Sequence, residues 1–138
     1  MSVQLDGADV GDSSPFVDGE IVVGYRDGVV VLTLLGEHDM ATANRLSAEI
    51  AHQASRSRAV VVVLSEAEFI DSAIVTALFT GERQMLAYGR RLVLEIRADS
   101  PATRLLEISG LQTKLVCTDS LGHAVRLAVE RRVVLTTD

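Results

Sequence analysis

Residues 59–80 read AVVVVLSEAEFIDSAIVTALFT, and they predict a strand, a short loop and a helix. Val60 to Leu64 is an unbroken apolar run, mostly β-branched, with polar flanks, which is typical of a strand covered on both faces. Asp71 and Ser72 then stand directly before a helical pattern that continues to about Tyr88. The sequence therefore predicts that a buried strand delivers a serine to the start of a helix.

The position of Ser72 has two interpretations. The first turn of a helix leaves backbone N–H groups unpaired and carries the positive end of the helix dipole, so a phosphate on this serine would be tolerated. Aspartate and serine are also favoured N-caps, and Asp71 or Ser72 could serve only to cap the helix. The dipeptide alone leaves both interpretations open.

Length, composition and charge exclude several classes of function. A chain of 138 residues with 48% apolar content fits one domain with a real core. Its 13 basic and 19 acidic side chains give a net charge of −6, whose field repels nucleic-acid backbones and anionic lipid surfaces. We expect no direct nucleic-acid partner and no membrane partner. No leader or long apolar segment is visible, so a cytoplasmic location is expected.

The residues that bind metals or cofactors are sparse. Cys117 is the single cysteine and lies in an apolar stretch, where a small buried side chain is expected rather than a reactive thiol. His38, His52 and His123 are far apart and share no metal-binding spacing. No glycine-rich phosphate loop occurs. We expect neither a cofactor nor a metal.

The chain before residue 36 predicts a tail and a hairpin. Residues 1–18 lack any period and are expected to be a mobile tail, with the folded domain over 19–131 and a C-terminal tail over 132–138. Glu20 to Tyr25 and Val29 to Leu35 are β-rich runs joined by Arg-Asp-Gly, which favours an antiparallel hairpin.

Two long helical patterns follow. Residues 41–56 repeat apolar side chains at helical spacing, with Thr42 as the expected N-cap. The helix that begins at Ser72 is expected to end at Gly89. Its apolar side consists of Ile74, Leu78 and Met85, and its polar side of Thr76, Thr80, Arg83 and Gln84.

The last third of the chain continues the alternation. Strands are predicted at Leu92 to Ile96 and at Thr113 to Thr118. Between them, a helix is expected to begin at Ser100 and Pro101 and to end at Gly110. Asp119-Ser120 is expected to begin the last helix. From residue 36 onward, helices and strands alternate. That order predicts an α/β domain, a mostly parallel sheet with an N-terminal antiparallel hairpin and about four helices.

A serine hydrolase is the enzyme alternative, because Ser72 follows a strand and begins a helix as a nucleophile elbow does. The required G-x-S-x-G pattern is absent: Ile70 and Ile74 replace both glycines. Asp71 would also oppose the negative charge that grows on the attacked substrate. The expected protein is therefore not an enzyme.

Several separated blocks resemble, in order and spacing, the STAS domain of anti-sigma factor antagonists. They are GEHDMATA at 36–43, VVVVLS at 60–65, FIDSA at 69–73, RLVL at 91–94 and LEISGL at 106–111, and the resemblance covers residues 20 to about 130. It implies a single STAS-like domain in a bacterial regulatory protein. Such a protein binds an anti-sigma factor, usually a serine kinase, and thereby frees a sigma factor in a stress response.

The resemblance places the family's switch serine at Ser72, as the expected phosphorylation site. In the usual motif a second hydroxyl residue and a glycine follow, whereas Ala73 and Ile74 follow here. Ala73 leaves Ser72 as the one obvious phosphate acceptor of the motif. Ile74 either packs in the core or adds a branched side chain where a kinase would approach. His38 replaces the family's usual aliphatic residue.

The partner surface implied by the resemblance surrounds this serine. The expected partner-binding residues are Asp71, Ala73, Ile74, Thr76, Thr80, Arg83, Glu37, Asp39 and Thr42. The expected partners are an anti-sigma factor or serine kinase, and a phosphatase that acts on phosphorylated Ser72. A STAS scaffold or sensor that is not phosphorylated is the alternative within binding proteins.

Overall fold

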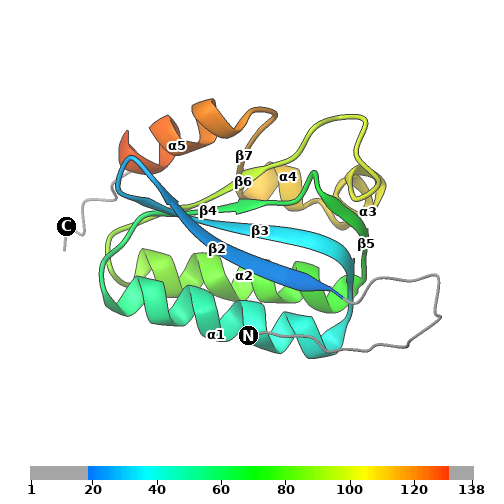
Figure 1. The fold of residues 1–138 in the computed structure, drawn as a ribbon, viewed down its shortest axis with the longest axis horizontal. Helices are drawn as coiled ribbons and strands as arrows, with labels where there is room; N and C mark the ends of the chain where they lie inside the picture. Colours follow the sequence, from blue (N-terminus) through cyan, green and yellow to red (C-terminus); the bar gives the residue numbers. More distant parts are fainter. Residues whose placement is uncertain (1–18, 131–138) are drawn as a thin grey trace.

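Six strands form one mixed sheet with helices on both faces (Figure 1). This computed structural model describes residues 19–130, so the expected tails and Arg131 lie outside the described residues. The strand order is β2 (Glu20–Arg26), β3 (Val29–His38), β4 (Val60–Val63), β6 (Leu92–Glu95) and β7 (Val116–Thr118). The remaining strand, β5 (Ala67–Ile70), pairs with the last residues of β3, past the part of β3 that pairs with β4. The α/β architecture and the mostly parallel sheet are confirmed.

The antiparallel pair β2–β3 confirms the predicted hairpin. Its two-residue turn places Asp27 at φ 53° and Gly28 at φ 80°, as a type I′ turn requires. β3 is longer than predicted and continues to His38. Residues 36–38, beyond the predicted end of this strand at Leu35, therefore belong to the sheet.

The two faces of the sheet bury alternate residues of β4. Val60 and Val62 belong to the core under α1 (Met40–Ser55) and α2 (Ser72–Leu86), whereas Val61 and Val63 face α5 (Leu121–Glu130). Figure 1 shows α1 and α2 below the sheet and α5 above it. The prediction that this strand is covered on both faces is confirmed.

Helices α1 and α2 lie close together on their shared face. An added Cβ at Gly81 of α2 would lie 2.8 Å from the Cδ1 atom of Ile50 in α1. Ile74, Leu78 and Met85 are buried, as their spacing predicted. The helix ends at Leu86, and Gly89 closes the following turn at φ 77°.

An ion pair between buried Glu82 and partly exposed Arg91 joins α2 to the start of β6. The Glu82 side chain, which is 7% exposed, lies 2.7 Å from an Arg91 guanidinium nitrogen. Its second oxygen accepts a hydrogen bond from the backbone N–H of Leu92 at 2.8 Å. One carboxylate therefore satisfies both a cation and the first backbone group of a core strand.

Helix starts differ from the prediction at two places. Asp39, not Thr42, is the N-cap of α1: its Oδ1 accepts from the N–H of Ala41, and Thr42 Oγ1 accepts from the N–H of Asp39. The third helix, α3 (Thr103–Ser109), begins after Ser100 and Pro101 rather than at them. Thr42 Oγ1 bonds to the N–H of Asp39, and Ser100 Oγ bonds to Thr103 Oγ1, so neither residue is the N-cap that was predicted.

Two further segments were predicted wrongly. Residues 67–70 were expected to be a loop and form β5, and residues 113–115 were expected to begin a strand. Gly110, at φ 74°, ends α3 and is followed by the short helix α4 (Leu111–Lys114), so the described chain has five helices rather than about four. The last helix follows Ser120, whose Oγ accepts from the N–H of His123 at 3.1 Å, as predicted.

Cys117 lies half-buried in β7 and packs against the core. Burial raises the pKa of its thiol to about 11, which keeps it protonated at neutral pH. The expectation of a packing residue rather than a reactive thiol fits this environment.

Candidate functional site: a serine between two grooves

The parallel pair β3–β5 brings the starts of α1 and α2 together. Glu37 pairs with Phe69, and His38 pairs with Ile70. The backbone N–H of Asp71 then donates to the carbonyl of His38 at 3.1 Å. The two strands therefore end side by side, and each leads directly into a helix. The structure thereby places the end of β3 and the start of α1 beside the start of α2.

Aspartates cap both helices at this edge. Asp71 Oδ1 accepts from the N–H of Ala73 at 2.8 Å, as Asp39 Oδ1 does from the N–H of Ala41 at 3.0 Å. Ser72 is the first residue of α2, and it is exposed. Because Asp71 performs the capping, the hydroxyl of Ser72 is not needed for it. The positive ends of two helix dipoles meet at this serine.

Ser72 lines two grooves. The first, of about 390 Å³, lies between α1 and α2, and its lining includes Met40, Asn44, Ser72, Ala73, Thr76 and Thr80. The second, of about 360 Å³, lies between the β5–α2 junction and α3, and its lining includes Phe69, Asp71, Ser72, Pro101, Leu105 and Ile108. The serine therefore stands on the ridge that separates two concave surfaces.

Three large apolar side chains stand exposed around these grooves, and sequence reasoning missed them. Met40, Phe69 and Ile108 are 68%, 53% and 73% exposed. We call these three residues the apolar rim. Phe69 belongs to the segment predicted as a loop. The burial pattern of its strand is buried, exposed, exposed, buried, so no alternation in the sequence marked it. Exposed apolar groups beside a groove are typical of protein interaction surfaces.

The predicted partner-binding residues fall into accessible and inaccessible groups. Asp71, Ala73, Thr76 and Thr80 line the grooves. Arg83 is exposed but lies in the last turn of α2, beyond the residues that line either groove. Asp39 is exposed, and Glu37 is half-buried within β3.

Thr42 and Ile74 require a correction, because both are buried. Thr42 is 5% exposed, and Ile74 is 0% exposed and belongs to the core. Neither side chain is available to a partner. This answers the question raised by Ile74: its branched chain points inward, and it does not obstruct the approach to Ser72.

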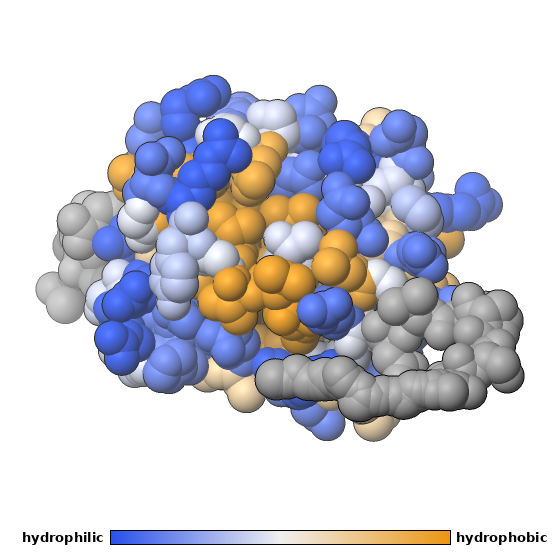
Figure 2. Space-filling view, viewed as in Figure 1, coloured by the Kyte–Doolittle hydropathy of each residue, from blue (hydrophilic) through white to orange (hydrophobic). Residues whose placement is uncertain are grey.

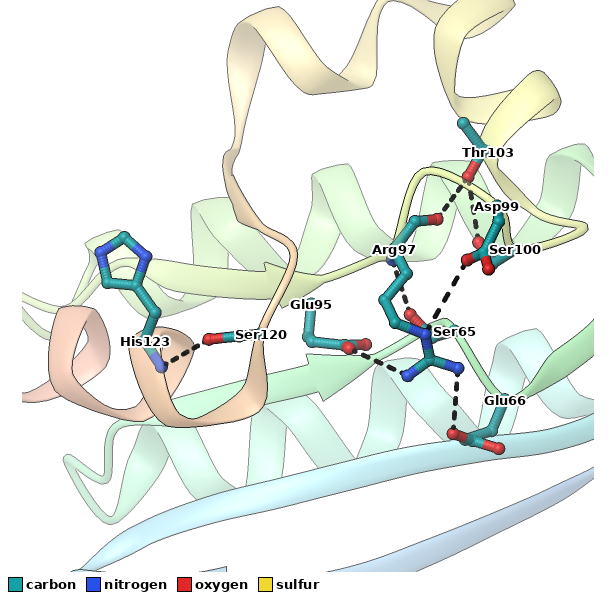
Figure 3. Close-up of polar contacts among 9 residues, drawn as sticks. All are labelled: Ser65, Glu66, Glu95, Arg97, Asp99, Ser100, Thr103, Ser120 and His123. Atoms are coloured by element: carbon teal, nitrogen blue, oxygen red, sulfur yellow. Dashed lines mark hydrogen bonds and ion pairs between the residues drawn. The ribbon is translucent and has the colours of Figure 1, made fainter.

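Polar contacts around Arg97 hold the start of α3 against the strand ends (Figure 3), and α3 lines one side of the second groove. Arg97 lies 3.5 Å from Glu66, 3.6 Å from Glu95 and 3.9 Å from Asp99, measured between nitrogen and oxygen atoms. Its N–H donates to Ser65 Oγ, and its carbonyl accepts from Thr103 Oγ1 at 2.8 Å. The end of β6 and the start of α3 are thereby fixed together.

The histidines give no support to a hydrolase. His38 Nε2 contacts the carbonyl of Leu35 at 2.8 Å, His123 Nδ1 contacts Thr118 Oγ1 at 2.8 Å, and His52 lies in the last turn of α1. Within residues 19–130, no hydrogen bond joins a histidine to the Ser72 hydroxyl. The same range contains no cluster of three His, Cys, Asp or Glu side chains that could hold a metal ion. None of its helices is long and apolar enough to cross a membrane.

His38 predicts a pH-dependent stability. Its ring is 0% exposed and Nδ1 has no partner within the described residues, and burial lowers the pKa of the imidazole. The unfolded chain therefore takes up a proton near pH 6.5 while the folded chain resists it. We expect the free energy of unfolding, from urea denaturation, to fall as pH drops below about 6.5. His38→Leu should flatten this dependence; an unchanged slope in the variant would contradict the assignment.

One family model and several solved structures match this chain. The family model is described as "Mlab, STAS domain" and matches residues 21–117. An anti-sigma factor antagonist from Mycobacterium paratuberculosis is 27% identical, with a TM-score of 0.70 over 85% of this chain and 98% of its own. No curated protein matches the sequence.

Two structures of SpoIIAA share the fold at lower identity. The anti-sigma factor antagonist SpoIIAA in its unphosphorylated form is 19% identical, with a TM-score of 0.62 over 80% of this chain and 98% of its own. The phosphorylated form of the Bacillus protein is 19% identical, with a TM-score of 0.58 over 78% of this chain and 97% of its own.

Proposed function

This chain belongs to the STAS-domain family, and on that premise we propose that it is an anti-sigma factor antagonist. It binds an anti-sigma factor and thereby releases a sigma factor. The observation that carries the proposal is the exposed Ser72, which begins α2 between two grooves. The solved antagonist from Mycobacterium paratuberculosis supports it at 27% identity.

The docking surface consists of the two grooves and the apolar rim. Burial of Met40, Phe69 and Ile108, which are all more than half exposed, supplies a hydrophobic contribution to binding. Asp39 and Asp71 add acidic groups near the centre, and these favour a partner with basic side chains there. Apolar side chains supply contact area, and the two aspartates favour a partner of complementary charge.

Phosphorylation of Ser72 switches this surface off. A phosphate adds about −1.5 to −2 charges, and the unpaired N–H groups at the start of α2 accept that charge in the free protein. Once a partner covers the grooves, the phosphate must lose water beside two carboxylates, Asp39 and Asp71. The cost falls on the complex and not on the fold, so release follows without unfolding.

The sequence departures in the motif are compatible with this switch. Ala73 has no hydroxyl, so Ser72 is the one acceptor at the start of the helix. Ile74 is buried and leaves the serine accessible. The anti-sigma factor is proposed to be the serine kinase, and a phosphatase reverses the modification. SpoIIAA has been solved in both phosphorylated and unphosphorylated forms, which supports a two-state protein on this fold.

The test is phosphate mapping. The chain is incubated with its cognate anti-sigma factor and ATP, and the product is analysed by mass spectrometry. We expect one added phosphate, on Ser72, and none in Ser72→Ala. Ser120→Ala is the matched control, because Ser120 is also exposed and also begins a helix. Phosphate on another residue contradicts the switch, and a stable complex that ignores ATP favours the scaffold alternative.

A further inference from the structure

The edge strand β2 presents a surface that the grooves around Ser72 do not use. Within residues 19–130 it pairs on one side only, with β3. Figure 1 shows β2 at the front, between α1 below and α5 above, and Figure 2 shows apolar residues gathered over β2 and β3 on this face. Val22, Val23 and Tyr25 are 40%, 42% and 64% exposed. The strand EIVVGYR has no proline or lysine, which are residues that commonly protect an edge from pairing.

The hairpin turn determines which backbone groups of β2 point outward. A two-residue type I′ turn is closed by hydrogen bonds between its flanking residues, here Arg26 and Val29. Alternate residues of an antiparallel strand direct their N–H and C=O groups to the same side. Gly24, Val22 and Glu20 therefore face β3. Ile21, Val23 and Tyr25 present their backbone groups at the open edge.

The register with β3 assigns the side chains of β2 to the two faces of the sheet. Ile21 lies opposite Leu34 and Val23 opposite Leu32, both of which belong to the core on the α1 face. Glu20 and Arg26 lie on the other face, together with Val22 and Gly24. A Cβ built at Gly122 of α5 would lie 3.8 Å from Arg26 Nη2, which agrees with this assignment.

We propose that two copies of this chain pair antiparallel through β2, about a two-fold axis at Val23. In this register Val23 meets its own copy, and Ile21 meets Tyr25. The three residues with outward backbone groups are therefore matched to one another, as ladder hydrogen bonding requires. The sheet becomes continuous across two subunits, and the interface is isologous.

Charge complementarity fixes this register. The same axis places Glu20 opposite Arg26 of the second copy, and the symmetry produces this pair twice. A slip of two residues keeps the hydrogen-bonding pattern but separates these charges. Val22 lies opposite Gly24 of the second copy. A Cβ added at Gly24 would have its nearest atom 3.9 Å away, so there is open space at Gly24 for the valine. Opposite charges and matched apolar pairs both stabilise cross-strand contacts.

Sedimentation equilibrium of the full chain tests the dimer. We expect the wild type to dimerise at protein concentrations below about 1 mM, and Val23→Asp to be monomeric, because the axis places two carboxylates against each other. Val129→Asp is the matched control: Val129 is 49% exposed on α5, and the variant should dimerise as the wild type does. Circular dichroism verifies that each variant is folded. A monomeric wild type, or a dimer that persists in Val23→Asp, overturns the proposal.

A charge exchange tests the register separately. Glu20→Arg or Arg26→Glu alone should raise the dimer dissociation constant about tenfold, because each creates two like-charge pairs. The double variant Glu20→Arg/Arg26→Glu restores opposite charges and should return the constant to within about threefold of wild type. Weak dimerisation in the double variant overturns the proposed register.

Discussion

Ser72→Asp is expected to weaken binding of the anti-sigma factor roughly a hundredfold, because an unpaired carboxylate buried in an interface costs several kcal/mol. The side chain stands between two grooves, so the partner that fills them must desolvate it. Asp71 is half-buried next to it and adds like-charge repulsion. Isothermal titration calorimetry with the purified anti-sigma factor measures the change.

Two variants separate charge from shape in that measurement. Ser72→Ala removes the hydroxyl without adding charge and should bind within about threefold of wild type. Ser120→Asp adds the same charge at the start of α5, away from both grooves, and should leave affinity unchanged. Equal affinities for Ser72→Asp and Ser120→Asp would show that the serine lies outside the interface.

Glu82→Ala is expected to lower the free energy of unfolding by about 3 kcal/mol, because it removes a buried carboxylate that binds both a guanidinium and a backbone N–H. The buried N–H of Leu92 loses its acceptor. Arg91, which is 29% exposed, loses its ion-pair partner at the junction of α2 and β6. Urea denaturation at neutral pH measures the difference.

Two control variants test whether the cost of Glu82→Ala arises from burial: a conservative change at Glu82 and the loss of an exposed ion pair. Glu82→Gln retains an acceptor for Leu92 and should cost less than Glu82→Ala. Glu66→Ala breaks an ion pair with Arg97 in which both side chains are about half exposed, at 49% and 50%. That loss should stay below about 1 kcal/mol. If Glu66→Ala costs as much as Glu82→Ala, burial does not account for the role of Glu82.

Periodicity predicted the elements that have one dominant pattern. The unbroken apolar run at 60–64 and the Asp-Gly dipeptide at 27–28 are strong local signals, and the strand and the hairpin turn that they predicted are present. β5 was missed because four residues with two exposed side chains, Glu68 and Phe69, are too short for the pattern to stand out. The pairing of β5 with β3 is a long-range contact that no local pattern contains.

The sequence predicted where Ser72 lies in the fold, but not the apolar side chains around it. Ser72, Asp71 and Thr76 lie where the motif and the helical spacing placed them. Ile108 and Met40 come from other elements, and their approach to Ser72 depends on how α3 and α1 pack. Thr42 and Ile74 were included in the partner surface on the basis of the resemblance, and both side chains are buried. For Ile74, the helical spacing had already placed the side chain on the apolar side.

The single backbone hydrogen bond from Asp71 to His38 has a consequence for partner choice. Together with the pairing of β3 and β5, it ties the starts of α1 and α2 to one edge of the sheet. A rigid platform of this kind pays little conformational entropy on association. If the chain is the antagonist proposed above, the choice of partner rests on the side chains around Ser72, and we expect substitutions there to change which partner it binds.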